Sequence, residues 1–82
     1  MPELARFHGI IVKMFFSGRP PAHFHVLYGE LYGVFDIETQ GMIEGDLPPK
    51  TARLVSIWAA LYKQQLLDVW NRREPRPLPP LV

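Results

Sequence analysis

The feature that most constrains the fold of this chain is a change in hydrophobic periodicity near residue 46. Before that point, short β-branched and aromatic runs alternate with glycine- and proline-containing breaks, which is typical of β-strands. Asp46-Leu47-Pro48-Pro49 then suits a helix entry, and neither glycine nor proline occurs from Lys50 to Arg73. The sequence therefore predicts strands first and one long helix afterwards.

The strands are expected at residues 7–16, 23–28 and 31–38, and the segment MIEG (42–45) suits a short fourth strand. Gly29-Glu30 is short enough for a hairpin turn, so the strands form an antiparallel meander. The helical segment carries one apolar stripe that would cover this sheet: Leu54, Val55, Trp58, Leu61, Tyr62, Leu66 and Val69.

These patterns predict an α+β fold, an antiparallel three- to four-stranded β-meander covered on one face by a single long C-terminal α-helix. Residues 1–73 form the single domain that a chain of 82 residues has room for. Residues 74–82 hold four prolines and form an extended tail that packs Leu78 or Leu81 on this domain or on a partner. We expect deletion of residues 75–82 to leave folding intact.

Composition excludes several classes of protein. The absence of cysteine excludes disulfide frameworks and thiolate zinc sites, and it suits a reducing cytoplasm. The N-terminal residues have no long apolar run, so no secretory signal is expected, and the longest apolar stretch, GIIVKMFF, is too short to cross a bilayer. A formal charge of +1 gives no strong field that would attract nucleic acid, although RNA binding stays open.

Alternation along the strands assigns the side chains to two faces of the sheet. The residues expected to face the helix are Ile10, Val12, Met14, Phe16, Phe24, Val26, Tyr28, Phe35 and Ile37. The opposite face then collects polar side chains that have catalytic or ligand chemistry: Lys13, His23, His25, Asp36 and Glu38. Apolar residues share that opposite face, namely Ile11, Phe15, Leu27 and Val34.

Four interpretations of this face remain open. A solvated sheet face is ordinarily polar, so these residues need no function. The apolar members favour binding of a partner protein, through Phe15, Leu27 and Val34. His23-x-His25 with Asp36 or Glu38 has the ligand types of a metal site, but this signal is weak and no metal or cofactor is predicted.

The fourth interpretation is acid–base catalysis without a metal. His23 and His25 could deprotonate a ribose 2′-hydroxyl and protonate the leaving oxygen, because histidine titrates near neutral pH. Asp36 and Glu38 complete the candidate catalytic set. Lys13 and Arg19 are the candidate contacts to a phosphate or to nucleic acid.

The segments MPELARFHGIIVKMFF, PPAHFHVLYG, VFDIET, MIEGDLP and RLVSIWAALYKQQLLDVW resemble the small prokaryotic family of the domain of unknown function DUF4160, across nearly residues 1–73. The block HFHV-x-YG is the most specific part. This chain departs from the family at Ala22, where two prolines usually abut the first histidine.

The resemblance implies genomic context rather than chemistry. Such proteins are similar to one half of a two-gene module proposed to be a toxin–antitoxin pair, so a small cognate, antitoxin-like partner protein is expected. The leading hypothesis is therefore a cytoplasmic, toxin-like protein that cleaves or binds RNA through the histidine and carboxylate face. The alternative is a non-enzymatic interaction module whose open sheet face docks a partner protein.

Overall fold

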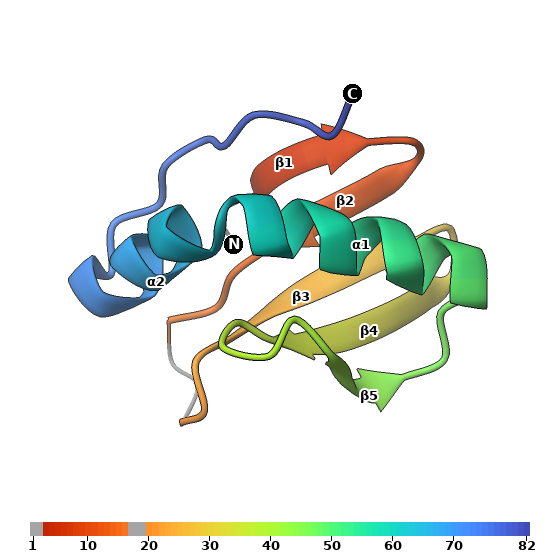
Figure 1. Cartoon of the computed structure of the whole chain (residues 1–82), viewed down its shortest axis with the longest axis horizontal. Helices are drawn as coiled ribbons and strands as arrows, with labels where there is room; N and C mark the ends of the chain where they lie inside the picture. Colours follow the sequence, from red (N-terminus) through yellow and green to blue (C-terminus); the bar gives the residue numbers. More distant parts are fainter. Residues whose placement is uncertain (1–2, 17–19) are drawn as a thin grey trace.

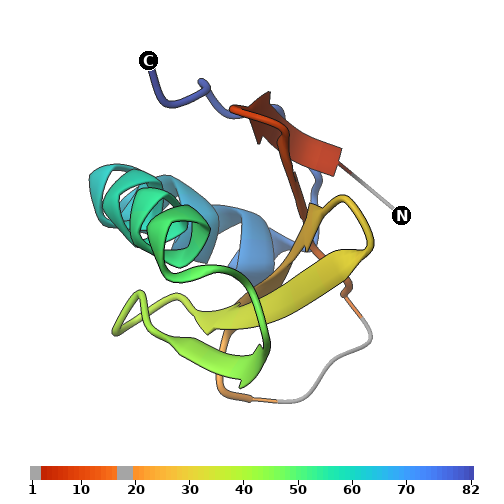
Figure 2. The same cartoon turned by 90° about the vertical axis from the view of Figure 1, so that its right-hand side faces the viewer.

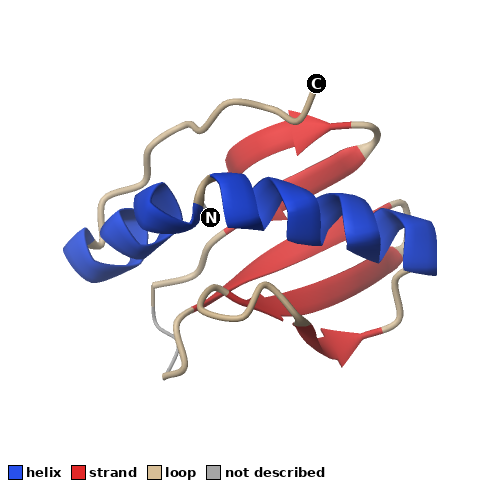
Figure 3. Ribbon diagram, in the orientation of Figure 1, coloured by secondary structure: helices blue, strands red, loops and turns tan. Residues whose placement is uncertain are grey.

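The computed structural model describes residues 3–16 and 20–82 as two layers, an antiparallel sheet with helices on one face (Figures 1 and 3). The α+β class is therefore confirmed. The five strands follow one another in spatial order as a simple meander. They are β1 (Glu3–Phe7), β2 (Ile10–Lys13), β3 (His23–Tyr28), β4 (Leu31–Asp36) and β5 (Met42–Gly45), followed by the helices α1 (Pro49–Leu61) and α2 (Lys63–Arg72).

The N-terminal hairpin differs from the single strand expected at residues 7–16. His8 and Gly9 both have positive φ, 51° and 78°, and form the two-residue turn that joins β1 to β2. Two positive φ values suit the right-handed twist of a hairpin, and histidine enters this region more readily than β-branched residues do. The third strand also ends earlier than expected, at Asp36, because residues 37–39 form a turn toward β5.

The sheet face that meets the helices is the one expected from alternation. Its side chains are at most 1% exposed at Ile10, Val12, Met14, Phe24, Val26, Phe35 and Ile37. Phe16 and Tyr28 pack partly buried at the margin of this core. Trp58 of α1 is fully buried over the sheet, with its ring 5.5 Å from that of Phe7 and 6.0 Å from that of Phe24.

The single long helix of the prediction is wrong, because Tyr62 interrupts it with φ −113° and ψ 26°. A straight helix over residues 50–73 would be about 36 Å long, whereas the longest dimension of the protein is 30 Å. The break separates α2 from the axis of α1, and α2 buries Leu66, Val69 and Trp70. Leu61, which was assigned to the buried stripe, is instead 62% exposed.

The C-terminal segment packs on the domain. The backbone N–H of Leu78 donates to the carbonyl of Leu4 at 2.8 Å, and the Leu78 side chain is 8% exposed. Figure 1 shows the segment running back above α2 and α1 toward β1. Residues 74–82 therefore contribute to the core that the preceding elements form.

Candidate functional site

The sheet face opposite α1 and α2, called the open face below, carries the candidate site. Figure 2 shows α1 nearly end-on, on one side of the sheet only. The strand register aligns one row of residues across all five strands: Glu3, Lys13, His25, Val34 and Glu44. Opposed side chains in such a row lie about 5 Å apart and interact directly.

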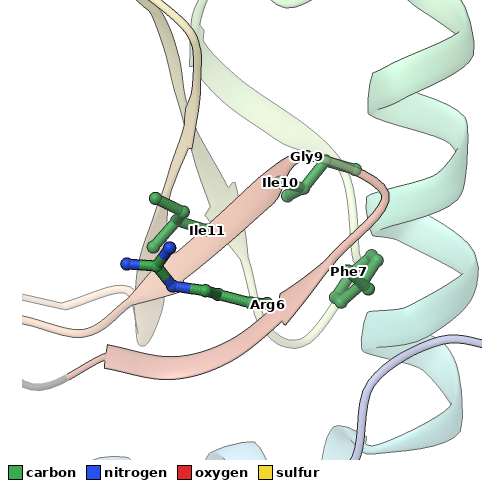
Figure 4. A pocket seen from close by; sticks show the side chains of 5 residues that line it. All are labelled: Arg6, Phe7, Gly9, Ile10 and Ile11. Carbon is green, nitrogen blue, oxygen red and sulfur yellow. The ribbon is translucent and has the colours of Figure 1, made fainter.

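A second row on the open face is apolar at its centre. Arg6, Ile11, Leu27 and Tyr32 are consecutive partners from β1 to β4. Leu27 is 36% and Tyr32 43% exposed, although both are large and mostly apolar. Arg6 and Ile11 lie together on the side of the hairpin away from α1, while Phe7 points toward that helix (Figure 4). These two and Phe7, Gly9 and Ile10 line a hollow of about 330 Å³.

His25 is a partly buried imidazole in the first row. Its ring packs edge-on against Phe15 with 4.2 Å between ring centroids. Its Nδ1 is buried without a hydrogen-bond partner in the described part of the chain. Burial, followed by the nearby His23, lowers the pKa of His25, and the carboxylate of Glu44 opposes this shift. These surroundings therefore favour the neutral form of the His25 imidazole.

His23 lies beside His25, with 5.4 Å between their ring centroids. Its Nδ1 is 2.8 Å from the carbonyl oxygen of Pro21. Because a carbonyl can only accept, we assign the proton of neutral His23 to Nδ1, which leaves Nε2 as the basic nitrogen. One imidazole nitrogen is thus engaged with the backbone.

The last turn of α2 supplies a neighbour of His23 that the sequence did not indicate. The ring of Trp70 lies 5.0 Å from that of His23, and the Arg73 guanidinium is 5.0 Å from the centre of the Trp70 ring. Arg73 also donates to the carbonyl of Phe16 at 2.6 Å. These contacts hold α2 against the end of the sheet where the histidines lie.

The two candidate carboxylates have structural partners. Asp36 is the register partner of His23, but its Oδ1 accepts the backbone N–H groups of Glu38 at 2.7 Å and Thr39 at 3.3 Å. This is the side-chain turn that aspartate commonly forms. Glu38 lies beyond the end of β4 and pairs with Lys63 of α2 at 3.3 Å. The structure therefore does not bring Glu38 to the histidines.

The remaining candidates are distributed as follows. Lys13 is the register partner of His25, and Leu27 lies in the apolar row. Val34, opposite His25, is only 8% exposed. Arg19 lies outside the described residues. Tyr32 was missed as a member of this face, although it lies two residues before Val34 and alternation alone identifies it; its hydroxyl donates to Glu44 at 3.0 Å.

No group of three or more histidine, aspartate or glutamate side chains is placed to hold a metal ion within residues 3–16 and 20–82. The histidine pair therefore lacks, within these ranges, the third ligand that the metal interpretation requires. Neither α1 nor α2 has the length and apolar character needed to cross a membrane.

Comparison with known proteins gives one finding. The family model described as a domain of unknown function (DUF4160) matches residues 9–71, from the β1–β2 turn to the end of α2. The match includes the histidine-containing strand and the whole sheet except β1. No curated protein and no solved structure matches the chain.

Proposed function

Because the chain belongs to the DUF4160 family, whose description assigns no activity, we propose a function from the geometry of the open face. The protein is a cytoplasmic interaction module, and its open face binds a small cognate partner protein. The observation that carries this proposal is the apolar centre formed by the exposed Leu27 and Tyr32 and the partly buried Ile11 across three neighbouring strands.

The arrangement of charges around this centre supports the proposal. Glu3 pairs with Arg6 at 2.7 Å at the β1 edge, and Glu44 accepts the Tyr32 hydroxyl toward the β5 edge. An apolar centre with a polar rim is the usual anatomy of a protein–protein interface. A sheet face that only met solvent would not need large apolar side chains in the middle of its strands.

The geometry of the polar candidates also favours binding over catalysis. One oxygen of the Asp36 carboxylate is already hydrogen-bonded within the protein, and the Glu38 carboxylate is paired with Lys63. Groups held in this way shape the end of the sheet. They are less available for proton transfer to a substrate.

The test is co-expression with the product of the neighbouring gene, followed by calorimetry on the purified proteins. Leu27→Glu places a charge in the apolar centre and should weaken binding at least about 30-fold, the effect of losing one hot spot of roughly 2 kcal/mol. The matched control is Ile57→Glu on α1, where the side chain is 47% exposed on the other side of the protein. Binding unchanged by Leu27→Glu would contradict the proposal.

A second candidate function is a toxin-like activity on RNA, favoured by a His25 imidazole held toward its neutral form beside His23, with Lys13 opposite. A neutral imidazole can accept a proton, and a lysine can neutralise a phosphate. The test compares growth and total-RNA integrity after induction of the wild type and of the His23→Ala/His25→Ala variant, in a bacterium that lacks the partner gene. Both proteins are first shown to accumulate in folded form.

The outcomes separate the two functions. Growth arrest with RNA loss in the wild type alone would support the catalytic pair. Arrest by both proteins would keep toxicity and exclude the histidine mechanism. The absence of arrest in either would favour the interaction module.

A further inference from the structure

A hollow of about 240 Å³ lies at the end of the molecule where α1 begins, away from the open face. Figure 2 looks onto this end, with the first turn of α1 nearest the viewer. The hollow is formed where the β1–β2 turn and the end of β3 meet that first turn. The residues that line it are His8, Ile10, Tyr28, Lys50, Thr51 and Leu54.

The first turn of α1 has no side-chain cap. Its N-cap residue is Pro48, which offers no side-chain acceptor, and Pro49 has no N–H. The first backbone bond of the helix is donated by Ala52 to the carbonyl of Pro48 at 2.9 Å. The N–H groups of Lys50 and Thr51 therefore have no acceptor in the described part of the chain. No acidic residue lies in this turn to balance the positive end of the helix dipole.

Thr51 gives an independent indication of a ligand. It is the one polar residue among the buried residues of the described chain, with 6% of its surface exposed. Its hydroxyl makes no hydrogen bond with another described residue. Among the described residues, His25 Nδ1 is the one side-chain polar atom that is fully buried without a hydrogen-bond partner. The Thr51 hydroxyl, which has no partner either, is therefore still accessible to solvent. Thr51 is among the residues that line the hollow.

The polar groups around the hollow share the ability to donate a hydrogen bond. Two backbone N–H groups, the Thr51 hydroxyl, the Lys50 ammonium and the polar tips of His8 and Tyr28 all can donate hydrogen bonds. No carboxylate of the described residues lines the hollow. Donors on residues that surround an uncapped helix N-terminus beside a lysine suit an anion with several oxygens. We propose that this hollow binds a phosphate group.

This phosphate site is separate from the open face. Ile10 is in the core under the helices, and Lys50, Thr51 and Leu54 belong to α1, whereas the open face is the other side of the sheet. A partner protein on the open face and a phosphate at α1 can therefore be bound at the same time. The phosphate site adds a second ligand to the proposed interaction module. This site does not depend on whether the open face binds a partner protein.

The test follows the backbone amide signals of Lys50 and Thr51 by ¹⁵N–¹H NMR during titration of the full chain. One titration uses inorganic phosphate, one uses adenosine 5′-monophosphate, and a third uses sodium chloride at matched ionic strength. We expect saturable shifts of these two amides with phosphate and not with chloride. Equal affinities would identify the free ion as sufficient, and tighter binding of the ester would show that an organic carrier adds contacts.

The variants separate a built site from general charge attraction. Lys50→Gln and Thr51→Val should each weaken phosphate binding about tenfold, because each removes a donor to a charged group. Thr51→Ser keeps the hydroxyl and should retain binding. Arg53→Gln removes an exposed cation one turn further along α1 and should have no effect. Dispersed amide spectra establish that each variant is folded.

Two results would overturn the proposal. One is the absence of saturation with both phosphate and the ester. The other is an equal loss of affinity in Arg53→Gln and Lys50→Gln, since that would attribute binding to overall charge.

Discussion

The indole Nε1 of Trp58 donates a hydrogen bond to the carbonyl of Pro79 at 2.8 Å, and this bond ties the C-terminal segment to the centre of the core. Trp58 is fully buried, so no water replaces this acceptor without entering the core. The segment 74–82 thereby satisfies the polar atom of Trp58, the largest fully buried side chain of the described residues. Leu78, next to Pro79, adds apolar burial at the same place.

Deletion of residues 75–82 should therefore destabilise the protein, contrary to the expectation from composition. Burial of Leu78 contributes roughly 1.5–3 kcal/mol, and an unsatisfied indole N–H costs about 1–3 kcal/mol. Urea unfolding should show a loss of roughly 2.5–6 kcal/mol, the sum of these two effects. Deletion of the fully exposed Val82 alone is the control. Equal unfolding midpoints for the long deletion and the wild type would contradict this role of the segment.

Trp58→Ala should remove a large part of the stability of the protein and lower its melting temperature strongly. The substitution empties the position where the ring contacts Phe7, Phe24 and Tyr62. Such a change in a core costs about 3–5 kcal/mol, while a domain of this size has a margin of only about 5–12 kcal/mol. Circular dichroism against temperature measures the effect. A melt unchanged from the wild type would refute the packing of α1 on the sheet.

Stability should fall as the pH is lowered through the range in which His25 titrates. The pKa of His25 is lower in the folded protein than its ordinary value of 6.5, so the unfolded chain binds the proton more tightly. The full stability is present above the ordinary pKa of 6.5, where the imidazole is neutral in both the folded and the unfolded chain. It is lost progressively as the pH falls from there through the folded-state pKa.

Urea midpoints at pH 7, 6 and 5 measure this dependence, with His25→Gln as the comparison. The variant keeps a polar side chain that does not titrate. It should lose less stability than the wild type over the same interval. Identical pH dependence of the two proteins would show that His25 does not cause the loss.

Gly45→Ala should destabilise the β4–β5 pairing. Gly45 has φ +111°, and an added Cβ would lie 2.6 Å from the Cα of Gly33. Both the positive φ and the short contact with Gly33 oppose a side chain at position 45. The substitution should lower the free energy of unfolding by about 1–3 kcal/mol. Gly41→Ala is the matched control, because its Cβ would meet Thr39 Oγ1 at 3.4 Å. Thermal melts should show a lower midpoint for Gly45→Ala only, and equal midpoints would contradict the constraint.

Several features of the candidate site could be predicted from alternation alone. Lys13, His25 and Val34 are neighbours in one row because each occupies the open-face position of its own strand. The same pattern contains Tyr32, which completes the apolar row. The partial burial of His25 could not be predicted, since it depends on how Phe15 folds over the ring after β2 has ended.

The sequence by itself determined the α+β class, the core face of the strands and the apolar character of the open face, because strand alternation is a local property of the chain. Only the tertiary structure decided that Glu38 pairs with Lys63, that Trp70 contacts His23 and that the C-terminal segment closes the core at Leu4 and Trp58. These contacts join residues that are distant along the chain. They depend on where the helix breaks at Tyr62 and how far it can extend over a small sheet, and no local pattern encodes that length.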